Sequence, residues 1–87
     1  MNLFPLKILT PEGEVTSADV TQIIVRTYEG ALGIMAKHEP MLAACPQGTI
    51  RIQKDDAWTA YESEPFMLNM DGTAVTILST NVKPCDA

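Results

Sequence analysis

The sequence has few of the residues on which catalytic, metal-binding and disulfide-rich proteins depend. Its 87 residues include two cysteines, one histidine, two phenylalanines, two tyrosines and one tryptophan. Cys45 and Cys85 are too few for a disulfide framework, so we expect them to be reduced, with one bridge between them as the alternative. Together with His38 they lack the close pair spacing of a zinc site, and we expect no metal.

Basic residues and long apolar runs are also scarce. Six Lys and Arg stand against 11 Asp and Glu, for a net charge of −5, and the basic residues are scattered from Lys7 to Lys83. This balance argues against a nucleic-acid partner. No run of about 18 apolar residues is present to span a bilayer, and the opening MNLFPLKILT does not resemble a secretory signal. The length predicts a single domain over residues 1–87 with a modest core, which favours a binding partner.

Short runs rich in β-branched and aromatic residues lie between frequent turn signals. The turn signals contain Gly, Pro, Asp or Asn, as in Pro11-Glu12-Gly13, Asp55-Asp56 and Asp71-Gly72. The runs predict strands. They are Leu6–Leu9, Ile23–Tyr28, Thr49–Gln53, Trp58–Tyr61 and Val75–Leu78.

Alternation of apolar and polar residues indicates how these strands pack. Ile50 and Ile52 share one face, and Phe66, Leu68 and Met70 share another, opposed by Met67 and Asn69. Val75 and Ile77 are opposed by Thr76 and by Leu78, an apolar residue on the outer side. One apolar side per strand predicts an all-β fold, either a two-sheet antiparallel sandwich or a barrel.

The segment Glu29–Cys45 is ambiguous. Its apolar residues fall at helical spacing, but Gly30, Gly33 and Pro40 oppose a helix, so we predict an irregular loop followed by a strand Met41–Cys45. The apolar run Ala31–Met35 in such a loop must be either tucked under a sheet or covered by another protein. Past Val82 we expect a short tail.

Candidate catalytic groups are few. His38 could act as a general base, but its neighbour Glu39 would point to the opposite face of an extended chain, and a polar loop or interface residue is the simpler interpretation. Cys45 is the main candidate nucleophile and lies in no known motif. Asp55-Asp56 is explained by a hairpin turn, and no phosphate-binding glycine motif is present. We therefore expect no catalytic residue.

Three ordered motifs resemble the epsilon subunit of rotary ATP synthases. They are Glu29-Gly30-Ala31-Leu32-Gly33-Ile34-Met35, His38-Glu39-Pro40-Met41-Leu42 and Pro46-Gln47-Gly48-Thr49-Ile50-Arg51-Ile52. The opening Leu6–Gly13 is similar to the first strand and turn of that family, and Phe66–Leu78 to its closing strands. The resemblance covers nearly the whole chain as the N-terminal domain of the family, and it implies a sandwich of about ten strands.

The function that the resemblance implies is mechanical. It is that of a non-catalytic rotor subunit in the central stalk of a proton- or sodium-translocating ATP synthase, which links the gamma subunit to the membrane c ring. The resemblance implies a peripheral place on the cytoplasmic face of the bacterial inner membrane, held only through the complex. No cofactor is expected. The helical hairpin that follows the sandwich in many members is absent from these residues, so no nucleotide is expected to bind.

The resemblance also implies contact residues. For the c ring they are Glu29, Gly30, Ala31, Leu32 and Gly33; for the gamma subunit they are Thr10, His38, Glu39, Pro40, Met41, Leu42 and Ala43. Many relatives carry an acid where this chain has Ala31, and Glu29 could substitute for it. Further apolar contact area is expected from Ile34 and Met35.

Two other functions remain open from the sequence. A free-standing β-sandwich module for carbohydrate or another ligand would need exposed aromatics on one face, and Trp58 and Tyr61, three residues apart, point to opposite faces of a regular strand. A small hydrolase would need Cys45 and His38 to meet.

Overall fold

The computed structural model describes residues 2–86, which form ten strands and no helix. The strands are β1 Phe4–Thr10, β2 Gly13–Val20, β3 Gln22–Thr27, β4 Gly30–Met35, β5 Met41–Cys45, β6 Gly48–Lys54, β7 Ala57–Ser63, β8 Phe66–Met70, β9 Val75–Ser79 and β10 Val82–Cys85. No helix among these residues is available to cross a membrane.

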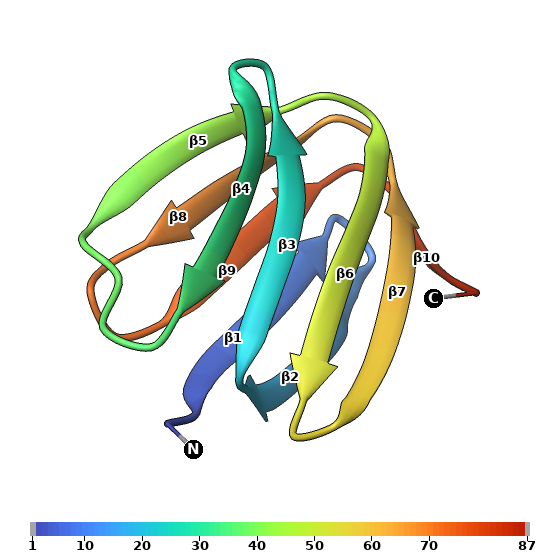
Figure 1. The fold of residues 1–87 in the computed structure, drawn as a ribbon. Helices are drawn as coiled ribbons and strands as arrows, with labels where there is room; N and C mark the ends of the chain where they lie inside the picture. Colours follow the sequence, from blue (N-terminus) through green and yellow to red (C-terminus); the bar gives the residue numbers. More distant parts are fainter. Residues whose placement is uncertain (1, 87) are drawn as a thin grey trace.

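The strands form two five-stranded sheets, ordered β2-β1-β9-β8-β5 and β10-β7-β6-β3-β4. Figure 1 shows the sheets as two layers, with β1, β9, β8 and β5 running obliquely behind β4, β3, β6 and β7. All neighbouring pairs are antiparallel except β1 and β9, where Leu6 pairs with Val75 and Leu9 with Leu78 in parallel register. This confirms the predicted two-sheet sandwich.

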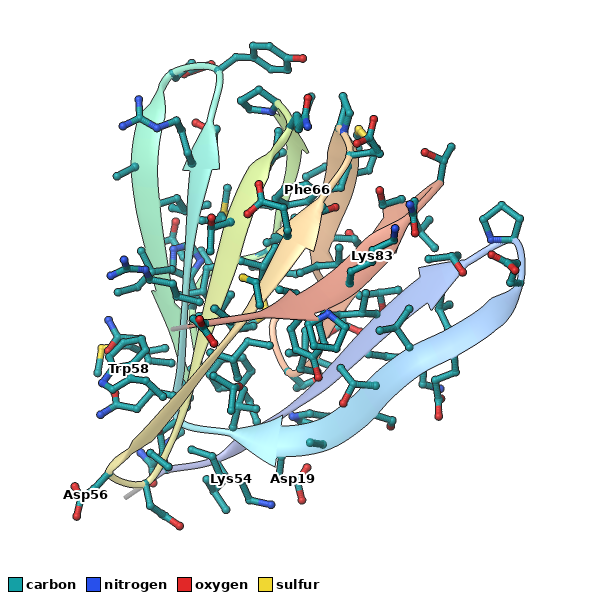
Figure 2. All side chains as sticks on the ribbon, turned by 90° about the vertical axis from the view of Figure 1, so that its right-hand side faces the viewer. Asp19, Lys54, Asp56, Trp58, Phe66 and Lys83 are labelled. Carbon is teal, nitrogen blue, oxygen red and sulfur yellow. The ribbon has the colours of Figure 1, made fainter. Side chains whose placement is uncertain are left out.

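A single apolar core fills the space between the sheets. Ile8 and Ile77 from the first sheet and Ile23 and Ile50 from the second have no exposed surface. Figure 2, turned by 90°, shows side chains filling the space between the layers, with Trp58 on the outside and Asp56 at the β6–β7 turn. Because inward positions alternate with outward ones, β1, β3, β6, β8 and β9 each contribute two or three buried side chains to this core, and the edge strands contribute one each.

The structure confirms most of the predicted local elements. Met41–Cys45 is strand β5, and Asp55-Asp56 forms the β6–β7 hairpin turn, where Lys54 pairs with Ala57. Asp55 takes a positive φ of 55° there, a conformation that Asp tolerates better than most residues. Neither cysteine forms a disulfide; Cys45 is buried and Cys85 exposed.

The prediction of an irregular loop from Glu29 to the start of β5 is wrong for half of those residues. Gly30–Met35 is a regular strand, β4, paired with β3 from Thr27↔Gly30 to Gln22↔Met35. Gly30 has a φ of +127°, which suits glycine and lets a two-residue tip close the hairpin. Ile34 is fully buried in the core, so our expectation that it contacts a partner is also wrong.

Two further strands lie where no strand was expected. β10 occupies the expected tail and pairs with β7, Lys83 opposite Glu62; its Pro84 is tolerated because β10 is an edge strand. β2 is an edge strand of the other sheet, the first one, and its pairing with β1 has a register irregularity between Ile8 and Leu9. Neither strand has the alternating apolar pattern, since β10 is the four-residue VKPC and half of β2 consists of residues that are rare in strands.

Candidate protein-binding surface

An apolar row crosses the outer face of the first sheet. Leu9 pairs with Leu78, Leu78 with Met67, and Met67 with Ala44, so the four side chains lie side by side across β1, β9, β8 and β5. Leu78 is 51% exposed and Met67 39%. An outer sheet face is ordinarily polar, because only the inner face needs to be apolar. A row of this kind is typical of a protein-binding surface.

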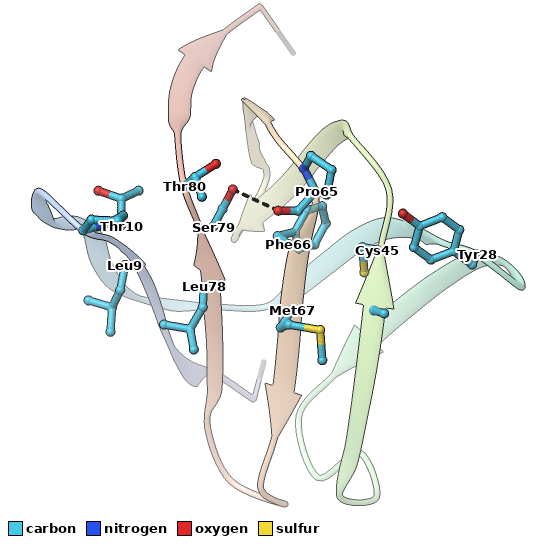
Figure 3. Close-up of a pocket in the computed structure, with 12 residues that line it drawn as sticks. Leu9, Thr10, Tyr28, Cys45, Pro65, Phe66, Met67, Leu78, Ser79 and Thr80 are labelled. Carbon is cyan, nitrogen blue, oxygen red and sulfur yellow. Dashed lines mark hydrogen bonds between the residues drawn. The ribbon is translucent and has the colours of Figure 1, made fainter.

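All four residues of the row line a hollow of about 570 Å³, which we call the face hollow. Figure 3 shows Leu9, Leu78 and Met67 projecting from three adjacent strands, with Tyr28 across from them beyond Cys45. The rim comes from chain reversals, and most of the lining is apolar. The lining residues are Leu9, Thr10, Pro11, Tyr28, Ala44, Cys45, Pro65, Phe66, Met67, Leu78, Ser79 and Thr80.

Hydrogen bonds around Ser79 fix one wall of the face hollow. The Ser79 hydroxyl lies 3.1 Å from the carbonyl oxygen of Glu64 and 3.3 Å from that of Pro65, the second shown dashed in Figure 3. The backbone N–H of Asn81 donates to the Ser79 hydroxyl at 3.4 Å, and the hydroxyl of Ser63 donates to it at 3.1 Å. These bonds tie the β7–β8 turn to the β9–β10 turn, so the wall is preformed.

The β3–β4 hairpin tip projects beside the face hollow. The Thr27 hydroxyl donates to the carbonyl of Gly30 at 2.9 Å and accepts the N–H of Glu29 at 3.0 Å. These bonds close the tip and leave Tyr28 69% exposed at its end. An exposed tyrosine on a fixed hairpin is well suited to a protein contact, because the backbone is already ordered and the side chain has only two χ angles to fix on binding.

A second hollow of about 390 Å³, which we call the edge cleft, lies between the start of β4 and β5. It is lined by 27–32 on one side and 41–44 on the other. The cleft therefore brings four of the five expected c-ring residues, Glu29 to Leu32, to the same place as Met41, Leu42 and Ala43. Gly33 lies one residue farther along β4, and Tyr28 and Ala44 line both hollows.

The expected gamma-contact residues divide between the two ends of the sandwich. Thr10 lines the face hollow, its hydroxyl accepting the N–H of Glu12 at 3.3 Å. His38, Glu39 and Pro40 precede β5 at the other end, since Met41 pairs with Met70 while Cys45 pairs with Phe66. The His38 Nδ1 lies 2.8 Å from the backbone carbonyl of Glu39, so this contact is to the main chain and not to the carboxylate.

The geometry does not assemble a catalytic centre from the candidate residues. Cys45 ends β5 and His38 precedes its start, so the two groups lie at opposite ends of a five-residue strand. Burial raises the pKa of the Cys45 thiol, which weakens it as a nucleophile. Within residues 2–86 no three His, Cys, Asp or Glu side chains gather closely enough to hold a metal ion. Tyr61 packs against the core while Trp58 is exposed, so they form no aromatic platform.

Reasoning from the sequence missed most of the apolar row. Leu9, Met67, Leu78, Ala44 and Tyr28 were not expected to contact a partner. The alternation had already placed Met67 and Leu78 on outward faces, and this was the available signal. What the sequence did not give was the strand order that places β1, β9, β8 and β5 next to one another.

Comparison with known proteins agrees with this architecture. Residues 3–84 match the model of the family described as ATP synthase, Delta/Epsilon chain, beta-sandwich domain. The ATP synthase epsilon chain of Caldicellulosiruptor bescii is 35% identical over 80 residues, covering 92% of this chain and 58% of that protein. The epsilon chain of Alkalihalophilus pseudofirmus is 39% identical over 79 residues, covering 91% and 59%. The chain thus spans less than two thirds of the length of these relatives.

Solved structures share the same fold at low sequence identity. A chain in the Euglena gracilis mitochondrial ATP synthase structure with OSCP, F1 and c ring matches with a TM-score of 0.88 at 19% identity, covering 94% of this chain and 53% of that one. A chain in the central stalk and c-ring structure of Tetrahymena thermophila matches with a TM-score of 0.79 at 18% identity, covering 94% and 65%. Since the family model spans residues 3–84, this chain belongs to the β-sandwich domain family of ATP synthase delta and epsilon chains.

Proposed function

We propose that this chain is a non-catalytic rotor subunit of an ATP synthase central stalk. In this role it holds the gamma subunit through the outer face of its first sheet and reaches the c ring with the β3–β4 hairpin tip. Membership in the delta and epsilon sandwich family supports the proposal. The observation that carries it is the exposed row Leu9–Leu78–Met67–Ala44, because nothing in an isolated sandwich calls for an apolar outer face.

A rotor subunit of this kind must stay bound to its partners while torque acts on the contact. A permanent contact is typically large, often above about 2,000 Å², and more apolar than ordinary surface. The row and the face hollow supply an apolar centre for it, and the Ser79 hydrogen bonds keep its wall in place. A close-packed core between two sheets also transmits force with little compression.

The contact residues follow from this arrangement as proposals. Thr10, Met41, Leu42 and Ala43 lie on or beside the surface assigned to gamma. His38, Glu39 and Pro40 contact gamma only if that subunit extends along the full length of β5. The hairpin tip that opens the segment 29–33 serves the c ring, with Glu29 as its carboxylate, while the free edge of β4 beyond the tip is left to the gamma subunit.

The complex determines the cellular setting in this proposal. The chain associates with the membrane only through its partners, on the cytoplasmic face of a bacterial inner membrane. The rotor that it joins couples proton or sodium movement to ATP synthesis at catalytic sites on other subunits. The chain itself binds no nucleotide and performs no chemistry.

Gel filtration of the chain with purified gamma subunit tests the proposal. We expect one co-eluting complex, and we expect Leu78→Glu to weaken it by at least about tenfold, because the carboxylate would be buried in an apolar contact. Leu3→Glu is the matched control, since Leu3 is 48% exposed and precedes β1, at the opposite end of that strand from Leu9. Separate elution of the two proteins at micromolar concentration would contradict the proposal, and so would equal effects of the two substitutions.

A further inference from the structure

The free edge of β4 is the least protected sheet edge of the molecule. Within residues 2–86, β4 is paired with β3 alone, so the other side of its backbone has no strand partner. Its sequence GALGIM contains no charge and no proline, and its pairing with β3 continues without a bulge over six residues. Edges of this kind pair readily with another chain, so natural proteins normally block them.

The other three edges carry the usual protection. β10 has four residues, with Lys83 and Pro84 among them. β2 carries Glu14 and Asp19 and has a register irregularity opposite β1. β5 is uncharged but short, and Pro40 and Pro46 bound it on both sides. β4 therefore differs from the other three edge strands, because it has neither a charge, nor a proline at or next to its ends, nor a bulge.

The edge cleft lies directly beside this open edge. Leu32 of β4 and Met41 and Ala43 of β5 line the cleft, and all three are only partly buried while they pack against the core. A strand added next to β4 would direct every second side chain inward, toward these residues. The cleft, at about 390 Å³, has room for an apolar side chain of that kind.

We propose that β4 accepts an added strand from the gamma subunit, and that an apolar side chain of this strand fills the edge cleft. The occupant is an extended, uncharged segment of about four to six residues, matched to the length of β4. Tyr28 and Ala44 line both the edge cleft and the face hollow, so the added strand continues the surface already assigned to gamma. This inference rests on the proposed function, because it takes gamma as the source of the strand.

Hydrogen exchange of the β4 amides tests the inference directly. In the complex with gamma we expect the β4 amides that exchange fastest in the free chain to slow by at least about tenfold, because strand pairing protects backbone N–H groups. The amides of β10, the opposite edge of the same sheet, should not change. A complex that forms but leaves β4 exchange unchanged overturns the inference and leaves the proposed function standing, whereas failure to form a complex removes both.

Substitutions separate strand addition from general covering of this region. Leu32→Glu places a carboxylate in the cleft, and Met35→Glu places one on the opposite side of the same strand. We expect Leu32→Glu to abolish the slowing of β4 exchange in the complex, while Met35→Glu retains it. Leu32→Gln serves if Leu32→Glu fails to fold, since it places an uncharged polar group at the same position in the cleft. Retained protection in the cleft variants overturns the inference.

The free chain is measured over a range of concentrations in the same experiment. Protection of β4 that rises with concentration in the absence of gamma would assign the edge to a second copy of this chain and overturn the assignment to gamma. We expect exchange in the free chain to be independent of concentration.

Discussion

Ser79 is the residue at which two chain reversals are joined. Its hydroxyl lies within 3.1 Å of the Glu64 carbonyl oxygen and 3.3 Å of the Pro65 carbonyl oxygen, and it accepts the backbone N–H of Asn81. The hydroxyl carries a single proton, so it can satisfy only one of these two carbonyls fully. The residue therefore holds the wall of the face hollow through bonds to the main chain and not through packing.

Removing this hydroxyl is expected to lower stability without disturbing the core. For Ser79→Ala we predict a loss of about 0.5–1.5 kcal/mol in the free energy of unfolding, because the part-buried Ser63 hydroxyl and the exposed main-chain groups of the two turns lose a hydrogen-bond partner. Urea denaturation measures this loss. Thr80→Ala is the control, since Thr80 is exposed and its side chain makes no hydrogen bond within the described residues. If Ser79→Ala were as stable as Thr80→Ala, the prediction would be wrong, because water would then replace the Ser79 hydroxyl fully.

Asp71 gives the stability a defined pH dependence. Its Oδ1 accepts the N–H groups of Ala74 and Thr73, each at 2.8 Å, and the Thr73 hydroxyl at 2.9 Å. These bonds, led by the one from Ala74, lower the pKa of the Asp71 carboxyl below its ordinary value. A lowered pKa in the folded state contributes stability above the ordinary carboxyl range, and that contribution is lost as the pH falls through the folded-state pKa.

We therefore predict that Asp71→Asn lowers the Tm at neutral pH and that the difference from the parent chain narrows as the pH falls into the acid range. Thermal unfolding followed by circular dichroism at several pH values measures it. Asp56→Asn is the control, because Asp56 lies in an exposed hairpin turn and accepts no hydrogen bond within residues 2–86. A difference for Asp71→Asn that stays constant down to acid pH would contradict the prediction.

At the scale of elements, the sequence predicted strands that alternate strongly and missed those that do not. β3, β6 and β9 follow from β-branched residues at every second position. β4 was predicted to be a loop because Gly30, Gly33 and Pro40 opposed the helix that its apolar spacing indicated. Both of its faces are apolar or glycine, so alternation gave no signal for a strand either. β2 and β10 are edge strands without an alternating pattern, formed by pairing with β1 and β7 and not by local preference.

The surface was harder to predict than the strands, for a physical reason. The apolar row needs β9 to pair with β1 across almost the whole chain, and no local pattern encodes that contact. The edge cleft likewise lies between two edge strands, β4 and β5, that belong to different sheets, so no local pattern in the sequence indicates it. Local alternation can say that Leu78 points outward, but only the strand order says that Leu9 and Met67 stand beside it.

The hairpin that begins β4 depends on one glycine. Gly30 has a φ of +127°, and a Cβ there would meet nothing within 4 Å, so the cost of a side chain is conformational and not steric. We predict that Gly30→Ala lowers the free energy of unfolding by about 1–3 kcal/mol. Chemical denaturation measures the loss.

Gly33→Ala is the matched control on the same strand. Gly33 has no positive φ, and its Cβ would lie 3.6 Å from the Gln22 Nε2, an ordinary contact. We expect this variant to be as stable as the parent chain or slightly more stable, because alanine restricts the unfolded chain. A loss at Gly33 as large as that at Gly30 would show that close packing, and not backbone conformation, limits the hairpin.

On the scale of the whole molecule, the first sheet carries two separate tasks on its two faces. Its inner face supplies Ile8, Leu68 and Ile77 to the one core shared with the second sheet. Its outer face supplies the apolar row. Because side chains alternate along a strand, neighbouring residues can serve stability and binding independently.

Ile77 and Leu78 on β9 separate the two tasks. Ile77 is fully buried between the sheets, and we predict that Ile77→Ala lowers the free energy of unfolding by about 2–5 kcal/mol, because it leaves a cavity in a small core. Leu78 is 51% exposed, and we expect Leu78→Ala to change stability by less than about 0.5 kcal/mol while it weakens the complex with gamma. Urea unfolding and titration calorimetry measure the two quantities on the same samples. If Leu78→Ala lost stability and kept its affinity, the outer row would belong to the fold and not to an interface, and the proposed function would lose the observation that carries it.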